Sequence, residues 1–308
     1  MELSLHRLRM LRELNRRGTV TAAASALHYT ASAVSQQLAQ LERDVGARLF
    51  ERVGRRVQLT ELGKLLAEHA EEILESVERA TLALEEAQEA RTVTLRAGVF
   101  ATVAAGLLPG ALELLSQRQP GIRVRTKQLA PEHSMQAVKD GEVDIAFTVN
   151  YSDAPTPWDP NLLGATVAVE RLHVAAPEGV LGGKDGGPVA LSDLAEHPWI
   201  IAGPRSHFGR AVRAACLRAG FQLRVTHEVE EQSTAMAMAA AGLGITLVSD
   251  LGLTLAPSGM EALPLTTPIT RTVSLAYRST TARRPALQMV IDVVRAAAAD
   301  LGLSAGGE

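Results

Sequence analysis

The sequence predicts an α/β protein in which a small helical head and one long helix precede a region of alternating strands and helices. Three observations support this order. Apolar residues recur at helical spacing over residues 5–45, one apolar stripe continues over 62–87, and short apolar strands alternate with helices beyond residue 91. With 308 residues, 46% of them hydrophobic and 21% charged, the chain is long enough for two or three packed domains.

Composition narrows the class of protein. The single Cys216 can form neither an internal disulfide nor a thiolate cluster for zinc. No apolar run reaches the roughly 18 to 20 residues of a membrane span, and the first seven residues lack the apolar core of an export signal. We therefore expect a cytoplasmic protein with no membrane partner, no metal and no cofactor.

Charge is unevenly distributed along the chain. Residues 1–66 carry eleven Arg and Lys against six Asp and Glu, whereas residues 67–91 carry two against eight. A basic head on a chain of net charge -3 suits a module that binds phosphates, because attraction to nucleic acid is local. Small N-terminal domains are also often mildly basic, so charge alone leaves that alternative open.

The first two elements are short helices. Leu residues at intervals of three alternate with Arg over residues 5–17, which predicts an amphipathic helix ended by Gly18. Thr21 can cap an Ala-rich helix that continues to about Leu27, and His28 and Tyr29 form a turn.

A third helix follows, capped by Thr30 and ended by Gly46. Its solvent face carries amides and hydroxyls, which can donate and accept at base edges in the major groove. The alternative is a bland polar helix. Two tightly connected helices behind a packing helix describe a helix-turn-helix. We expect DNA contacts from Thr30, Ala31, Ser32, Ser35, Gln36 and Gln40.

Residues 50–59 alternate as a short hairpin around Gly54. Such a wing can place Arg52, Arg55 and Arg56 on phosphates or in the minor groove. The first 60 residues are therefore expected to form a winged helix-turn-helix that binds double-stranded DNA.

This head resembles the LysR-type transcriptional regulators. Each matching piece is short, but their order and spacing are specific: Ala22-Ala23, Leu27, Ala33-Val34-Ser35, Leu41-Glu42, Val45-Gly46, Leu49-Phe50, Arg52, Leu59-Thr60 and Gly63. The chain departs from the commoner family pattern at Ala31 and Ser32, where Gln-Pro is frequent, and at Gln36, where Arg is frequent. The operator sequence therefore cannot be borrowed from relatives.

Residues 61–91 form the expected linker helix. Thr60 can cap it, and Leu62, Leu66, Ile73, Val77, Leu84 and Ala87 form one apolar seam in an acidic background. The alternative is a helix that lies on its own domain, but the small head offers little surface for such a length. In the resembled family this helix pairs two chains, and the resemblance favours a tetramer where the sequence supports only a dimer.

Residues 92–308 show strands and helices in turn. We predict strands at 92–99, 122–128, 143–149, 165–176, 199–202, 223–229, 246–248 and 272–277, and helices at 107–117, 134–139, 208–218, 234–241 and 285–301. The family resemblance extends here through Leu107-Leu108-Pro109, residues 141–146, Pro198-Trp199-Ile200 and residues 241–245. It implies two subdomains like those of periplasmic binding proteins, the first from 92–164 and 269–308 and the second from 165–268, with crossovers near 161–168 and 264–270.

A cleft between two such subdomains is a ligand site, because open sheets present strand ends and helix starts at one edge. The loops at Gly98–Thr102 and Gly203–Phe208 bring a hydroxyl to a helix start. N–H groups there, with Thr102 and Ser206, could hold an anion, although ordinary N-capping explains both hydroxyls nearly as well. The resemblance favours an effector site formed by Ala101, Thr102, Gln128, Pro131, Thr148, Ser206, His207 and Phe208. These N–H groups lead us to expect a small anionic effector. The absence of a dedicated acidic cluster at this cleft argues against a polycationic effector and leaves a neutral one open.

Two other function classes fit less well. An enzyme is disfavoured because the histidines are scattered, no Gly-x-Ser-x-Gly motif occurs, and residues 182–187 and 242–244 lack the spacing of nucleotide-binding loops. We therefore assign no catalytic residue. A solute-binding protein without DNA function would lack the basic head. The sequence thus indicates an effector-controlled transcriptional regulator, for which RNA polymerase is an allowed further partner.

Overall fold

The structure is a computed structural model that describes residues 3–53, 56–88, 93–181 and 187–305. The chain divides into two compact units, Met1–Ala90 and Arg91–Glu308. Among the described helices, none has both the length and the apolar character needed to cross a bilayer.

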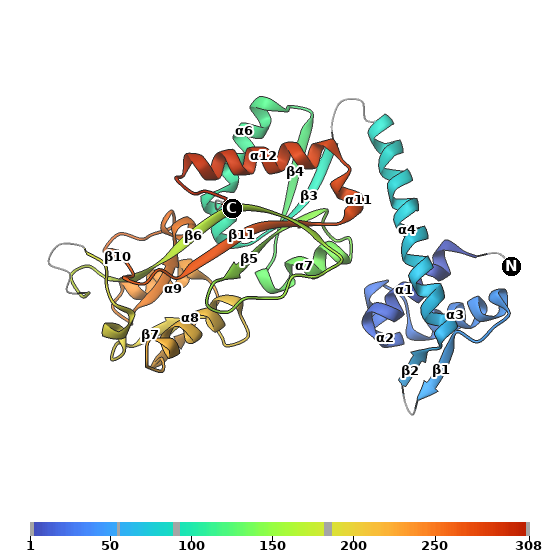
Figure 1. Ribbon diagram of the computed structural model, residues 1–308, viewed down its shortest axis with the longest axis horizontal. Helices are drawn as coiled ribbons and strands as arrows, with labels where there is room; N and C mark the ends of the chain where they lie inside the picture. The colour runs from blue at the N-terminus through green and yellow to red at the C-terminus, as the bar shows by residue number, and fades with distance from the viewer. Residues whose placement is uncertain (1–2, 54–55, 89–92, 182–186, 306–308) are drawn as a thin grey trace. The chain divides into compact units, whose positions relative to one another are not determined.

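The first unit is a winged helix-turn-helix followed by a long helix (Figure 1). Its elements are α1 (Leu5–Arg17), α2 (Val20–Ala26), α3 (Ala31–Val45), β1 (Phe50–Val53), β2 (Arg56–Leu59) and α4 (Glu61–Gln88). One apolar core joins α1 to α4; it includes Leu8, Leu11, Val34, Leu38, Leu41 and Leu49. The predicted order of elements in the head is confirmed.

Caps set the helix limits in this unit. Gly18 and Gly46 both have left-handed backbone (φ 71 and φ 74) and end α1 and α3, as glycine does readily. Thr30 caps α3 as expected. The prediction for α2 is wrong by two residues: the Thr19 hydroxyl accepts from the Ala22 N–H at 3.2 Å. Thr19 is the first extended residue after Gly18, whereas Thr21 already lies in the first helical turn.

Helix α4 packs on its own unit through its first half. Ala67, Ala70 and Leu74 are buried in the same core as α1, and Leu66 and Ile73 are partly buried against it. The alternative of a helix lying on its own domain therefore holds for this half. Another set of apolar side chains stays exposed: Leu62 at 43%, Leu65 at 49% and Leu84 at 63%. The Ala87 side chain lies outside the described part of the helix.

The second unit is built on a curled sheet with strand order β10-β6-β11-β5-β3-β4, and β9 pairs with β6. The strands are β3 (Val93–Val99), β4 (Ile122–Gln128), β5 (Ile145–Tyr151), β6 (Leu163–Pro177), β9 (Thr246–Ser249), β10 (Met260–Pro264) and β11 (Thr270–Tyr277). The pairs β3–β4 and β3–β5 are parallel, whereas β11 is antiparallel to both of its neighbours. Strands β7 (Trp199–Ile201) and β8 (Val225–Glu228) form a separate two-stranded parallel sheet.

Helices pack against these strands. They are α5 (Ala101–Gly106), α6 (Leu108–Arg118), α7 (Pro131–Lys139), α8 (His207–Arg218), α9 (Gln232–Ala240), α10 (Asp250–Leu253), α11 (Ser279–Ala282) and α12 (Pro285–Asp300), with a 3-10 turn at Leu191–Leu194. Helices α6 and α12 lie side by side (Figure 1). The helix expected over 107–117 is α6, which begins and ends one residue later, and the short helix α5 precedes it, separated from it by Leu107.

The two halves are joined through β6 and β11. Strand β6 pairs with β11 as far as Arg171 and with β9 from Leu172 onward. The first crossing therefore lies near residues 171–172, later than the expected 161–168, because one uninterrupted strand serves both sheets. Glu170, which lies next to this crossing, is fully buried.

Candidate functional site

The solvent face of α3 carries exposed polar side chains. Ser32, Ser35 and Gln36 are exposed, and Thr30 accepts a hydrogen bond from the Ala33 N–H at 3.2 Å while its hydroxyl lies 3.1 Å from that of Ser32. We call Ser32, Ser35 and Gln36 the reading face. Ala31 is exposed at its N-terminal edge. Hydroxyls and an amide at this spacing can reach base edges in a major groove.

Gln40, which the sequence reading grouped with these residues, is already engaged. Its amide nitrogen donates to Asp44 at 2.8 Å, and its amide oxygen accepts from Arg43 Nε at 3.0 Å. Gln37 accepts from Arg7 Nε at 3.2 Å in the same way. These contacts hold the C-terminal half of α3 in place and leave the reading face as its free polar part.

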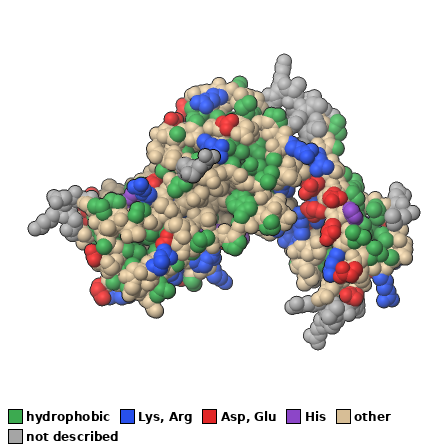
Figure 2. Space-filling view, in the orientation of Figure 1, with side chains coloured by type: hydrophobic (Ala, Val, Ile, Leu, Met, Phe, Trp, Pro, Cys, Tyr) green, Lys and Arg blue, Asp and Glu red, His purple; other side chains and the backbone are tan. Residues whose placement is uncertain are grey.

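The wing is a two-stranded antiparallel hairpin in which Phe50 pairs with Leu59 and Val53 with Arg56. The expected phosphate contacts of Arg52, Arg55 and Arg56 fall outside the part of the chain whose side chains are described. Acidic side chains gather along α4 (Figure 2), where Glu68 and Glu72 are exposed. A phosphate backbone would be repelled there.

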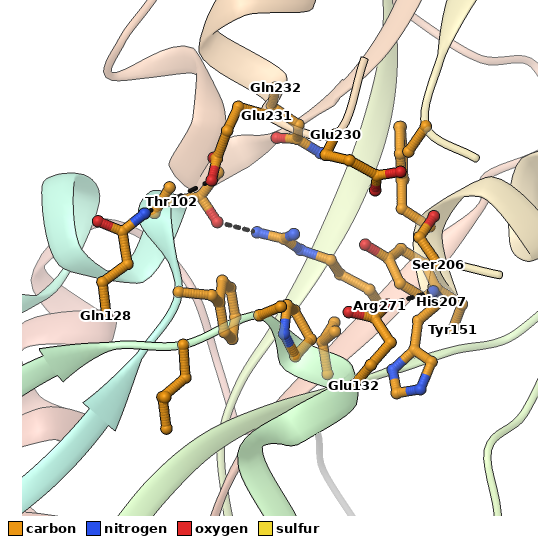
Figure 3. A pocket seen from close by; sticks show the side chains of 18 residues that line it. Thr102, Gln128, Glu132, Tyr151, Ser206, His207, Glu230, Glu231, Gln232 and Arg271 are labelled. Atoms are coloured by element: carbon orange, nitrogen blue, oxygen red, sulfur yellow. Dashed lines mark hydrogen bonds between the residues drawn. The ribbon is translucent and has the colours of Figure 1, made fainter. Parts of the chain in front are cut away.

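The second unit contains a cavity of about 400 Å³ between its two halves. Its lining comes from the ends of β3, β4 and β5 on one side and from the starts of α8 and α9 on the other. Seven predicted effector residues line it: Ala101, Thr102, Gln128, Pro131, Ser206, His207 and Phe208. Figure 3 shows the polar side chains around it. The loops that the sequence singled out do face one cavity.

Thr148 does not belong to this lining. It is buried, and its hydroxyl donates to the Ser274 backbone carbonyl at 3.3 Å. Successive residues of a strand face opposite sides, and Val149 and Tyr151 are the β5 residues that line the cavity. Thr148 is therefore the one predicted effector residue that the structure leaves outside the cavity lining.

Arg271 lies at the centre of the lining and is hydrogen-bonded to other residues of the protein. On β11 it pairs with Tyr151 on one neighbouring strand and Glu170 on the other. Its Nε donates to Glu170 at 2.7 Å and a terminal nitrogen donates to the Thr102 hydroxyl at 2.9 Å. The guanidinium also lies 5.6 Å from the centroid of the Phe100 ring. The Thr102 hydroxyl therefore already accepts a hydrogen bond from Arg271.

Electrostatics of this buried group follow from its partners. Burial disfavours the charge, but Glu170 and Tyr151 outweigh that penalty and raise the pKa of Arg271. Burial also disfavours the charged form of Tyr151. It therefore raises the pKa of the phenol, although the nearby Arg271 acts in the opposite direction. Glu170 also accepts from the Leu251 N–H at 2.7 Å. The guanidinium is charged, yet its charge is balanced inside the protein.

The start of α8 is satisfied by the protein itself. The Ser206 hydroxyl accepts from the Gly209 N–H at 2.8 Å and donates to the Gly203 carbonyl at 3.0 Å, so it is an ordinary N-cap. Glu132, from α7 in the other half, accepts from the His207 N–H. A second hydrogen bond across the cavity joins Gln128 to Glu231 at 3.4 Å.

Three carboxylates line the cavity: Glu132, Glu230 and Glu231. Glu230 accepts from the Gly203 N–H at 3.2 Å, and none of the three forms an ion pair with a described Lys or Arg. The expectation that the cleft has no acidic cluster, which argued against a polycationic effector, is therefore wrong.

His207 adds a neutral ring to the lining. Burial lowers its pKa, outweighing the opposing influence of Glu132, and a hydrogen bond joins the ring to the Val149 backbone. Its Nδ1 is buried without a hydrogen-bond partner among the described residues.

The sequence reading missed Glu132, Tyr151, Glu230, Glu231, Gln232 and Arg271, together with the apolar residues Phe100, Leu129, Ala130, Val149 and Ala202. A weak signal existed for Glu230 and Glu231, which follow a strand and precede a helix as Ser206 does. Arg271 and Glu170 gave none, because only the strand register places them side by side.

Comparisons with known proteins agree with both units. The model of the LysR substrate binding domain matches residues 88–299, and that of the bacterial regulatory helix-turn-helix protein, lysR family, matches residues 5–64. The transcriptional regulator ClcR of Pseudomonas putida is 29% identical over 80% of this chain and 83% of its own. A variant of full-length OxyR from Pseudomonas aeruginosa superposes with a TM-score of 0.63 at 21% identity, covering 96% of this chain and 95% of that one. Full-length CbnR, solved with its target DNA, gives 0.58 at 23%, covering 96% and 100%.

Proposed function

Since this chain belongs to the LysR family of bacterial transcriptional regulators, we propose that it reads an operator through α3 and that a small molecule in the cavity of the second unit controls this binding. The observation that carries the effector part is the cavity itself. Residues from both halves of the unit line one space of about 400 Å³, which is within the range of small-molecule sites.

The proposal assigns base contacts to the reading face. Ser32, Ser35 and Gln36 are exposed, whereas Gln40 is held by Asp44 and Arg43. Arg52, Arg55 and Arg56 supply phosphate or minor-groove contacts from the wing. A role in binding rather than catalysis is part of the proposal, and the relatives are named as regulators.

Control by the effector would act through the hydrogen bonds that cross the cavity. Glu132 to His207 N–H and Gln128 to Glu231 join the two halves without a ligand. A ligand that exchanges these bonds for its own changes how the halves close. If the two closures differ in DNA affinity, ligand and operator affinities are coupled reciprocally.

A variant that fills the cavity tests this coupling. Ala130 is exposed and lines the cavity, so Ala130→Trp should retain operator binding but lose the shift in footprint that a low-molecular-weight cell extract causes with the unaltered chain. Ala256→Trp, at another exposed position, is the control and should respond normally. An unchanged response of Ala130→Trp would place the effector elsewhere.

We also propose that two chains associate through the exposed apolar residues of α4. Leu65 and Leu84 are 49% and 63% exposed, and an apolar stripe of this kind is typical of helix pairing. Leu84→Glu should sediment as a smaller species while its circular dichroism stays unchanged. If the double variant Leu65→Glu, Leu84→Glu sediments like the unaltered chain, this interface is excluded.

A further inference from the structure

We propose that the cavity selects a small cation, a molecule with a positively charged nitrogen and an apolar body, and that it disfavours simple carboxylates. This inference rests on the cavity being the effector site and names the chemical class of its ligand. It depends on how donors, acceptors and charges are distributed over the lining.

The strong donors of the lining are already used. Arg271 donates to Glu170 and Thr102, and its interaction with Tyr151 adds a third partner. The Gln128 amide donates to Glu231, and the His207 N–H donates to Glu132. An entering carboxylate would find a guanidinium whose charge is already balanced by Glu170, and to replace Glu170 it would have to break that ion pair. Removing a buried charge from its partner is costly.

Acceptors, by contrast, are in excess. Glu132, Glu230 and Glu231 bring three negative charges to a lining whose one cation, Arg271, is paired with a fourth carboxylate, Glu170. Each of the three accepts one hydrogen bond from a neutral amide. Because an ionised carboxylate offers about four acceptor positions, each retains capacity for a ligand N–H.

His207 does not offset these negative charges. The residue lines the cavity and is 8% exposed. Burial lowers its pKa below the ordinary value, so the ring is neutral at pH 7 and adds no positive charge that would repel a cation.

The surroundings fit the rest of the molecule. Phe100 and Phe208 line the cavity and offer apolar contact to a hydrocarbon body, and aromatic faces attract cations. The cations nearest the start of α8 lie outside the lining. Arg210 donates to the Arg205 carbonyl and to Thr156, and Arg213 donates to the Ala202 carbonyl.

The preference can be measured through a reporter thiol in the cavity. Ala130→Cys places it in the lining, and Ala256→Cys is a control on the surface of the same unit. Each full-length variant is reacted with cationic 2-(trimethylammonium)ethyl and anionic 2-sulfonatoethyl methanethiosulfonate. The thiolate forms a mixed disulfide with either reagent and releases methanesulfinate. Both reagents meet the same thiolate, so the ratio of their rates reports the local field alone.

The native thiol does not interfere. Cys216 is buried, and burial raises its pKa to about 12, so it stays protonated and unreactive. If Ala130→Cys reacts too slowly to measure, Gln128→Cys, at an exposed lining position, is the second reporter.

We expect the cation-to-anion rate ratio to be at least about tenfold higher at Ala130→Cys than at Ala256→Cys, as in other clefts lined by one sign of charge. Glu230→Gln with Glu231→Gln should return it toward the control value. Glu178→Gln with Glu196→Gln, two exposed glutamates outside the lining, removes equal charge and should leave it unchanged. High salt should lower the ratio.

An equal or lower ratio in the cavity overturns the inference, as does a high ratio that survives the Glu230 and Glu231 substitutions. This result is independent of DNA. Failure of the proposed function would instead appear as an unchanged footprint response of Ala130→Trp, so the two failures are distinguishable.

Discussion

The reading face of α3 and the ligand cavity use polar side chains in opposite ways. Ser32, Ser35 and Gln36 stand exposed, and their only side-chain hydrogen bond with a described residue is the local one between Ser32 and Thr30. Thr102 and Arg271 in the cavity, by contrast, are buried and hydrogen-bonded to each other. Free groups on a rigid helix can meet both donors and acceptors at base edges. A buried lining with unused acceptors discriminates between ligands by their charge and by the hydrogen-bond donors that they carry.

The difference shows that a functional surface is defined by what remains unpaired, rather than by which residue types it contains. Gln36 and Gln40 are the same residue type on one helix, but Gln40 is bonded to Asp44, whereas Gln36 is exposed and has no side-chain hydrogen bond with a described residue. Thr102 and Ser206 look alike as hydroxyls at helix starts, but one holds Arg271 and the other caps its own helix.

The largest effect should come from breaking the saturated centre of the cavity. Arg271→Met leaves Glu170, which is fully buried, without its counter-ion and should lower the free energy of unfolding by about 3 to 5 kcal/mol. Urea unfolding followed by tryptophan fluorescence measures this, because Trp158 and Trp199 both belong to the second unit. Adding Glu170→Met should restore most of the loss. A single variant as stable as the unaltered chain would show that the pair is not buried.

On the reading face, Gln36→Ala should relax base preference at one position of each half-site, a loss of about 1 to 3 kcal/mol in discrimination. Competition binding with operator duplexes that differ at single bases measures it. Gln40→Ala is the matched control, and we expect a smaller change because its amide is held by Asp44. The reverse order of effects would mean that the contacts of Gln40 rearrange on DNA.

Caps should show the smallest effects and occur in both regions. Ser206→Ala and Thr19→Ala each remove a side-chain acceptor from a helix start and should lower the free energy of unfolding by about 1 kcal/mol. Fluorescence reports the first and circular dichroism the second. Thr21→Ala should stay within about 0.5 kcal/mol. If Ser206→Ala abolishes the effector response without loss of stability, Ser206 is a ligand contact and not merely a cap.

The sequence by itself determined the local features of this protein. The helix over residues 5–17, the caps at Gly18, Thr30 and Gly46, and the strand over 122–128 occur where they were predicted, because such signals act within one turn of chain. Most of the cavity-lining loops were found in the same way, since a hydroxyl at a helix start is a local pattern.

Only the tertiary structure decided the chemistry of the cavity. Tyr151, Glu170 and Arg271 come from three strands far apart in sequence, and their adjacency depends on the register of β5, β6 and β11. Glu132 reaches the start of α8 across 75 residues. Whether a polar side chain is free or paired is a property of such long-range contacts, and that is why the sequence located the site but misjudged its charge.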